Sequence, residues 1–193
     1  MTRISRIAAL GGISLAALMM SATASTPINV GPFHSVSLNG GGHVVVKYGK
    51  TQKVTMLKGN TECTTIKLEG SRHDQLSIGQ EGWFKCPSHY ELEIEIVTPD
   101  IAGLAIHGGG DIETDGKFPQ ASSLSVAVHG GGTIDARSLE AASVNAAVHG
   151  GGEVLVTAKA SLNAAVHGGG EIRFWGNPAV NSAVHGGGSV EKG

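Results

Sequence analysis

The second half of the chain alternates apolar and polar residues with a period of two. Within residues 125–129, Val126 and Val128 share one face, and the residues between them share the other. The same parity selects, before the glycine-rich turns, Leu104, Ile106, Val144, Ala146, Val148, Leu162, Ala164, Val166, Val180, Ser182 and Val184, and after them Ile112, Ile134, Val154, Ile172 and Val190. Because successive side chains of a strand point to opposite faces, the pattern predicts half-buried strands and not helices.

Five copies of the phrase His-Gly-Gly-Gly separate these segments. Their histidines recur at spacings of 22, 20, 18 and 18 residues: His107, His129, His149, His167 and His185. A sixth, divergent copy has Asn39 at the histidine place. Repetition at such a period is typical of stacked units that cannot bury their apolar side alone, and glycines permit the positive φ angles of a tight corner. The repeat therefore predicts an all-β fold, a parallel β-solenoid with glycine-rich turns and one coil per repeat.

The first half also indicates strands, with looser spacing and more charge. The predicted strands cover residues 35–38, 43–48, 53–57, 65–68, 75–78 and 90–97. We expect these N-terminal strands to form the first rungs and the cap of the solenoid. Residues 25–193 are thus predicted to be one domain, less regular over 25–100 and repetitive over 101–193.

The polar side of the alternation produces columns of identical residues. One column contains small residues, Ala105, Ala127, Ala147, Ala165 and Ala183, and the neighbouring column contains Asn145, Asn163 and Asn181. Stacked asparagines can hydrogen-bond to one another between strands. We expect a flat, smooth face whose columns are asparagine, alanine and histidine.

The first 24 residues have the form of a secretory signal peptide. Arg3 and Arg6 precede an apolar stretch over residues 7–20, and Ala22 and Ala24 form a small-residue cleavage site. A retained membrane anchor needs about 20 apolar residues, and this stretch is shorter. We expect export to the periplasm, the cell surface or the medium, with no membrane insertion after cleavage.

The cysteine content predicts a disulfide, and the charge of the chain limits the kinds of partner it can bind. Cys63 and Cys86 are the only cysteines, and in an exported chain they are expected to form a disulfide. The chain has 14 Lys and Arg against 16 Asp and Glu, and no basic patch interleaved with aromatic residues. This composition argues against nucleic acid as a partner.

The sequence resembles the bacterial exported family known as putative autotransporter adhesin, head GIN domain. The resemblance rests on the opening Phe-His-Ser-Val-Ser-Leu-Asn-Gly-Gly-Gly-His from Phe33, on Tyr-Glu-Leu-Glu-Ile-Glu-Ile-Val-Thr-Pro from Tyr90, and on the glycine-rich repeats that follow. It implies a right-handed parallel β-helix and an adhesive role, with no catalytic residues to transfer. The chain differs from the family pattern in having histidine at almost every turn.

Two enzymatic readings find little support in the residues. His-Gly-Gly-Gly matches the oxyanion loop of some esterases, but the Gly-x-Ser-x-Gly nucleophile motif is absent. Glu153 and Glu171 would be neighbours on adjacent rungs, close enough for a glycosidase carboxylate pair, but a solvated edge column beside a tight turn explains them much better.

The histidine ladder admits two interpretations. Imidazoles on adjacent rungs could converge on a zinc, copper or nickel ion. Alternatively, duplication of whole rungs stacks identical residues without any ligand. We therefore expect a non-enzymatic protein without a cofactor, whose repetitive face, including the histidines and asparagines, serves adhesion, binding or assembly. A cell-surface or polysaccharide ligand and self-association are the expected partners, and extracytoplasmic metal binding is the alternative.

Overall fold

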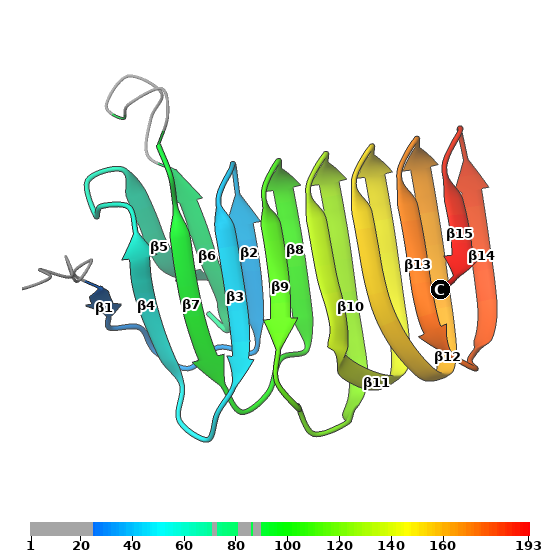
Figure 1. Cartoon of the computed structure of the whole chain (residues 1–193), viewed down its shortest axis with the longest axis horizontal. Helices are drawn as coiled ribbons and strands as arrows, with labels where there is room; N and C mark the ends of the chain where they lie inside the picture. The colour runs from blue at the N-terminus through cyan, green and yellow to red at the C-terminus, as the bar shows by residue number, and fades with distance from the viewer. Residues whose placement is uncertain (1–24, 71–72, 81–85, 87–89) are drawn as a thin grey trace, which may run out of the picture.

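A computed structural model describes residues 25–70, 73–80, 86 and 90–193. All regular elements in this part of the chain are β-strands. The described residues therefore contain no helix that could span a membrane. The proposed signal peptide lies outside the described residues. The strands stack side by side into an elongated solenoid, with the C-terminus at one end (Figure 1).

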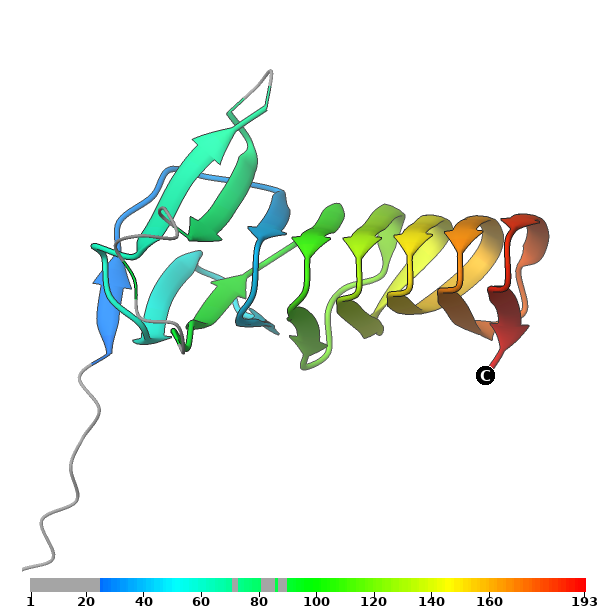
Figure 2. The same cartoon turned by 90° about the horizontal axis from the view of Figure 1, so that it is seen from above.

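Each rung of the solenoid consists of two strands joined at a glycine corner (Figure 2). The five rungs that run in chain order begin at β8 (Gly103–Gly108) and β9 (Asp111–Asp115). They continue through β10 (Ala121–Gly130), β11 (Thr133–Gly150), β12 (Glu153–Gly168), β13 (Glu171–Gly176), β14 (Ala179–His185) and β15 (Ser189–Lys192). β11 and β12 are long because each bends around the far corner and supplies the second strand of one rung and the first strand of the next.

The rungs are parallel and in register, as the repeat predicts. His129 pairs with His107 and His149, and His167 pairs with His149 and His185. Asn39 pairs with His107, so the divergent copy does occupy the histidine place. The inward residues selected by the alternation are buried in every rung except the last. They form one apolar column along the solenoid.

The order of the N-terminal rungs differs from the order of the chain. β2 (Ser35–Asn39) lies between β8 and β6 (Gln75–Gln80), and β3 (His43–Tyr48) lies between β9 and β7 (Glu93–Thr98). The rung that comes first in sequence is therefore second in space. With a rung on each side, its inward residues Val36, Leu38, Val44 and Val46 are fully buried.

Antiparallel strands cover the N-terminal end. β5 (Thr64–Glu69) pairs with β6, β4 (Lys53–Lys58) pairs with β7, and β1 (Thr26–Ile28) pairs with β4. These pairings confirm a cap but correct the expectation of purely parallel stacking. The strand predicted from residue 90 begins at Glu93 instead, because Tyr90 turns away from the sheet to bind a loop.

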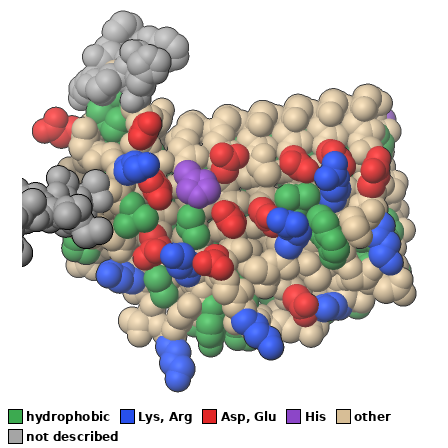
Figure 3. Space-filling model, in the orientation of Figure 1, with side chains coloured by type: hydrophobic (Ala, Val, Ile, Leu, Met, Phe, Trp, Pro, Cys, Tyr) green, Lys and Arg blue, Asp and Glu red, His purple; other side chains and the backbone are tan. Residues whose placement is uncertain are grey.

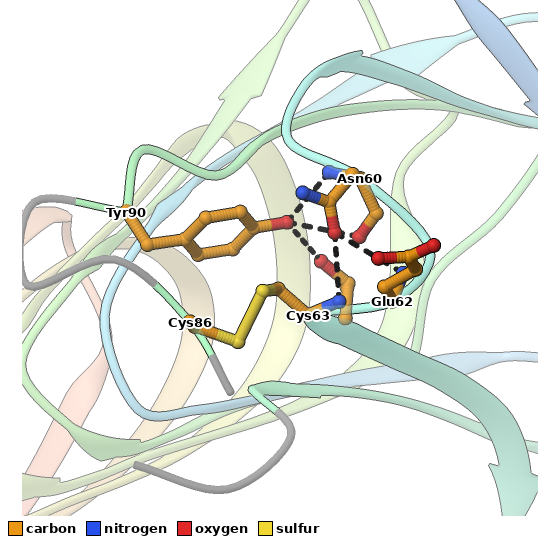
Figure 4. Close-up of a disulfide and its surroundings, with 6 residues drawn as sticks. Asn60, Glu62, Cys63, Cys86 and Tyr90 are labelled. Carbon is orange, nitrogen blue, oxygen red and sulfur yellow. Dashed lines mark hydrogen bonds between the residues drawn. A yellow bond between two sulfur atoms is a disulfide. The ribbon is translucent and has the colours of Figure 1, made fainter. Parts of the chain in front are cut away.

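That loop and the disulfide hold the cap together (Figure 4). Cys63 and Cys86 form the predicted disulfide, and their Cα atoms are 5.6 Å apart. The hydroxyl of Tyr90 accepts a hydrogen bond from the Asn60 backbone N–H at 2.7 Å and lies 2.5 Å from Thr64 Oγ1. The side chain of Asn60 in turn accepts the N–H of Cys63 at 2.8 Å. One tyrosine therefore fixes the turn that carries the first half-cystine.

The glycine corners have a specific steric cause. The first glycine of each repeat has φ between +124° and +131°. A Cβ on the third glycine would lie 2.2–2.5 Å from a backbone oxygen of the preceding rung from Gly132 onward. The middle glycines, in contrast, have open space where a Cβ would stand. Two of the three glycines are thus required by backbone conformation and close rung contact.

Candidate functional site

The two broad faces of the solenoid differ in charge. The face formed by β3, β7, β9, β13, β15 and the first parts of β11 and β12 carries Asp, Glu, Lys and Arg side chains (Figure 3). We call it the charged face. The opposite face is formed by β2, β6, β8, β10, β14 and the second parts of β11 and β12. We call it the neutral face, because its outward columns from β8 to β14 contain Gly, Ser, Asn, Ala and His.

Ion pairs occupy the charged face. Lys47 Nζ lies 2.8 Å from Glu95 Oε2, and this hydrogen bond and the carboxylate charge raise the pKa of Lys47. Arg137 Nε donates to Asp135 Oδ1 at 2.9 Å, and its guanidinium lies 5.2 Å from the ring centroid of Trp175. Partial burial acts to raise the pKa of Asp135, but the hydrogen bonds and charge of Arg137 outweigh it, so the pKa is lowered overall. Four carboxylates of this face, Glu93, Glu95, Asp135 and Glu171, are therefore held in ion pairs within the molecule.

A groove runs along the neutral face, across the strands. It has a volume of about 790 Å³ and crosses seven strands, from β6 to β14. At about 4.8 Å per strand its length is roughly 30 Å. The alanine column and the column of Ser125, Asn145, Asn163 and Asn181 line it over most of this length. Among the lining residues only Asp74 and His34, at the N-terminal end, can carry a charge.

The asparagine column is partly hydrogen-bonded between rungs. Asn163 Nδ2 donates to Asn145 Oδ1 at 3.0 Å, and the hydroxyls of Ser143 and Ser161 lie 2.8 Å apart beside it. All three asparagines are exposed. An asparagine amide has two donors and an acceptor oxygen, so one inter-rung bond leaves capacity for a ligand.

The histidine column stands beside the alanine column, two residues further along each strand. The ring centroids of successive histidines are 4.9–5.0 Å apart, with interplanar angles of 1–6°. At the N-terminal end of the stack, the Ser37 Oγ of the neighbouring alanine column lies 3.5 Å from His107 Nδ1. All five imidazoles are exposed, so their ring edges face solvent.

This geometry bears on the metal alternative. Imidazole nitrogens bind metal with lone pairs in the ring plane, at about 2.0–2.1 Å for zinc. Parallel rings direct those lone pairs side by side, so adjacent histidines do not converge on one ion unless the stack breaks. No group of three or more His, Cys, Asp or Glu among the described residues is placed to hold a metal. The metal hypothesis thus finds no support in the arrangement.

The structure also places the carboxylates considered for glycoside cleavage. Glu153 and Glu171 are neighbours in adjacent rungs, as expected. Glu171 is bound by the guanidinium of Arg173 on the charged face. The glutamates thus lie on the face opposite the groove.

Sequence reasoning missed the N-terminal end of the groove. His34, Asp74 and Gln75 line it because β6 pairs with β2, far from it in sequence. His34 Nδ1 also lies 2.8 Å from Asp100 Oδ1. No local signal relates these residues. The chain also has two pairs of adjacent aromatic residues. Phe174 is buried in the last rungs and Trp175 is half-buried, while Trp83 and Phe84 lie outside the described residues.

Comparison with known proteins agrees with this architecture. The model of the family described as putative auto-transporter adhesin, head GIN domain, matches residues 32–122 and 119–178, so the chain belongs to this family. A putative adhesin from Bacteroides fragilis is similar at 16% identity and a TM-score of 0.55, covering 88% of this chain and 96% of its own.

Two further solved structures are similar at lower scores. A putative adhesin from Parabacteroides merdae shows 14% identity, a TM-score of 0.42 and coverage of 88% and 95%. A putative cell adhesion protein from Clostridium sporogenes shows 14% identity, a TM-score of 0.43 and coverage of 88% and 97%. No protein with curated function matches the sequence. The description of the family as an auto-transporter adhesin supports an adhesion-like role for this chain.

Proposed function

We propose that this protein is an exported, non-enzymatic adhesion module that binds an extended, uncharged polysaccharide along the groove of the neutral face. The observation that carries the proposal is the groove itself, in which the alanine column repeats over five strands, β8 to β14, and the asparagine column over the last three of them. A ligand that makes the same contact at every rung must be a polymer with a regular repeat. Its affinity would then accumulate from many weak contacts, as in multivalent binding.

The chemistry of the columns favours sugar over a charged polymer. Amides of Asn145, Asn163 and Asn181 and the hydroxyl of Ser125 can donate to and accept from sugar hydroxyls. The alanine column offers small apolar contacts between the polar columns, where the C–H faces of a sugar ring can approach closely. Because no lining residue between β8 and β14 carries a formal charge, an anionic polymer gains no electrostatic attraction there.

The charged face is a weaker candidate for adhesion. Several of its carboxylates are already engaged by Lys and Arg side chains, as in the pairs Lys47–Glu95, Lys58–Glu93 and Arg173–Glu171. A ligand would have to replace these contacts. The neutral face requires no such exchange.

The test uses the full-length mature protein with a panel of soluble polysaccharides, neutral and acidic, measured by affinity electrophoresis and calorimetry. Ala165→Glu places bulk and charge in the groove, and we expect at least about tenfold weaker binding of the neutral polymer that binds wild type. Thr133→Glu is the matched control, because Glu153 and Glu171 already occupy that column on the opposite face. It should bind as wild type does.

Three results would overturn the proposal. One is failure of every neutral polysaccharide to bind. Another is equal loss of binding in Ala165→Glu and Thr133→Glu when circular dichroism shows both folded. The third is shortening of the polysaccharide during incubation, which would make the protein an enzyme.

A further inference from the structure

The histidine column gives the neutral face a row of groups that can take up protons. It consists of five exposed imidazoles whose ring centroids follow one another at 4.9–5.0 Å, so the column is about 20 Å long. Imidazole is the side chain that ordinarily changes charge between pH 8 and pH 5. A protonated ring has an N–H donor on each nitrogen. The exposed ring edges leave such donors accessible to a ligand.

The column borders the groove along the same rungs. Each histidine follows the alanine of its strand by two positions, so the Cα atoms of the two residues are roughly 7 Å apart. In β11, for example, Ala147 lies between Asn145 and His149 on the outward side. The alanines line the groove, whereas the histidines stand just outside its lining, at its edge. A polymer that lies over the alanines is therefore within reach of the imidazoles.

The column is not paired with acidic side chains of its own chain. Among the described residues, no hydrogen bond or ion pair joins any of the five imidazoles to a carboxylate, and His107 lies near the hydroxyl of Ser37. The titratable groups of the adjoining segments are His43, Asp111, Glu153 and Glu171 directly after glycine corners, the ion pair of Glu140 and Lys159 at the far corner, and Asp74, His34 and Asp100 at the N-terminal end of the groove. Those after the corners belong to the charged face, on the other side of the apolar interior. A positive charge on the column is thus left for a ligand to compensate.

We propose that the histidine column binds the carboxylates of an acidic polysaccharide under mildly acidic conditions, while the sugar backbone lies in the groove. The inference rests on the proposed function for the position of the backbone, and it adds a second class of ligand. A polymer with regularly repeated carboxylates can place several of them against several imidazoles at once, because the rings recur at every rung. At neutral pH the same face offers such a polymer no net charge.

The spacing of the rings couples binding to proton uptake. Neighbouring imidazolium groups 4.9–5.0 Å apart repel one another, and a carboxylate beside them offsets that repulsion. A bound acidic polymer therefore favours the protonated column over the neutral one. We expect binding near pH 6.5 to take up protons, which calorimetry detects as a heat that depends on the ionisation enthalpy of the buffer.

The test measures binding of three acidic polysaccharides, polygalacturonate, alginate and hyaluronate, to the mature protein by calorimetry at pH 8 and pH 5.5. Their carboxyl groups stay ionised at both pH values. We expect at least one of them to bind at least about tenfold more tightly at pH 5.5, and added salt to weaken this binding. The matched neutral ligand is the same polymer with its carboxyl groups reduced to alcohols, whose affinity should not change with pH.

A double variant, His149→Asn with His167→Asn, removes the two central donors. Asparagine is suited to the column because Asn39 already occupies the equivalent place. The affinity of the variant for the acidic polymer at pH 5.5 should fall to within about threefold of its value at pH 8. His43→Asn, on the charged face in register with Asp111, is the control and should bind as wild type does.

Several results would overturn the inference. They are failure of all three acidic polymers to bind at pH 5.5, equal affinity at the two pH values, and unchanged affinity in the double variant when circular dichroism shows both proteins folded. Binding of a neutral polysaccharide alongside any of these would leave the proposed groove ligand intact. Histidine-dependent binding of an acidic polymer without binding of any neutral one would instead uphold the column and refute the neutral ligand.

Discussion

At the scale of single residues, the glycine corner distinguishes three positions that look identical in sequence. Gly150 has φ of +125°, and a Cβ there would lie 2.5 Å from the Gly130 oxygen. A Cβ on Gly152 would lie 2.5 Å from both Gly132 O and Val128 Cγ1. Around a Cβ on Gly151 there is nothing within 4 Å. The three glycines of one repeat should therefore respond differently to the same substitution.

We predict that Gly151→Ala changes the free energy of unfolding by no more than about 0.5 kcal/mol, as a typical surface substitution does. Gly150→Ala and Gly152→Ala should each lose roughly 1–3 kcal/mol or more, because they force a strained φ or a backbone clash. Denaturant unfolding of the three variants measures this. Equal losses at all three positions would mean that the corner is not built as described.

A second prediction at this scale concerns Asp135. Its pKa is lowered by Arg137 despite partial burial, so its ionised form contributes stability above the unfolded pKa of about 3.9. That contribution is lost as the pH falls through the lower, folded pKa. Asp135→Asn should therefore lower the melting temperature near pH 7 by at most about 2–4 °C, since exposed ion pairs contribute about 1 kcal/mol or less.

The difference between wild type and Asp135→Asn should shrink below about pH 4, where the unfolded carboxylate takes up a proton, and vanish once the pH is below the folded pKa as well. Thermal unfolding at low ionic strength over this pH range provides the measurement. A difference that grows on acidification would contradict the sign of the pKa shift.

At the scale of elements, the cap and the repeats are held by different interactions. The repeats rely on in-register parallel pairing and a continuous apolar column, so each rung is stabilised mainly by its neighbours. The cap relies on antiparallel strands, the Tyr90 hydrogen bonds and the disulfide between Cys63 and Cys86, which are 23 residues apart.

We predict that replacing both cysteines by alanine destabilises the cap by about 2–4 kcal/mol, the usual effect of removing a disulfide across a loop of this length. Amide hydrogen exchange should show faster exchange in β4, β5 and β6. Protection in β11 and β12, several rungs away, should stay near the wild-type level. Uniform loss of protection along the chain would show that the solenoid unfolds as one cooperative unit.

At the scale of the whole molecule, the solenoid has two dissimilar faces and two dissimilar ends. Several carboxylates of the charged face form ion pairs with Lys and Arg side chains, while the neutral face presents repeated columns and a groove. The N-terminal end is capped, and the C-terminal end exposes the inward side of its last rung. The difference between the faces directs the ligand proposal to the neutral face.

The sequence by itself determined the repeated part of the fold. Period-two alternation assigned inward residues from Leu104 to Val166 and Ile172 correctly, because the direction of a strand side chain is a local property. The recurrence of the same phrase in every repeat likewise implied the asparagine, alanine and histidine columns. The disulfide was predictable because the chain contains only two cysteines and its first residues predict export.

The tertiary structure decided what depends on neighbours in space. The sequence does not reveal that β2 lies between β6 and β8, because any apolar strand edge can pair with several others and long-range packing selects among them. For the same reason the sequence does not place His34 and Asp74 together in the groove, because they belong to segments that share no pattern. Val180 and Val184 have the inward parity of Leu162 and Val166 yet are exposed, because burial requires a rung on each side and, among the described residues, β14 pairs with β12 alone.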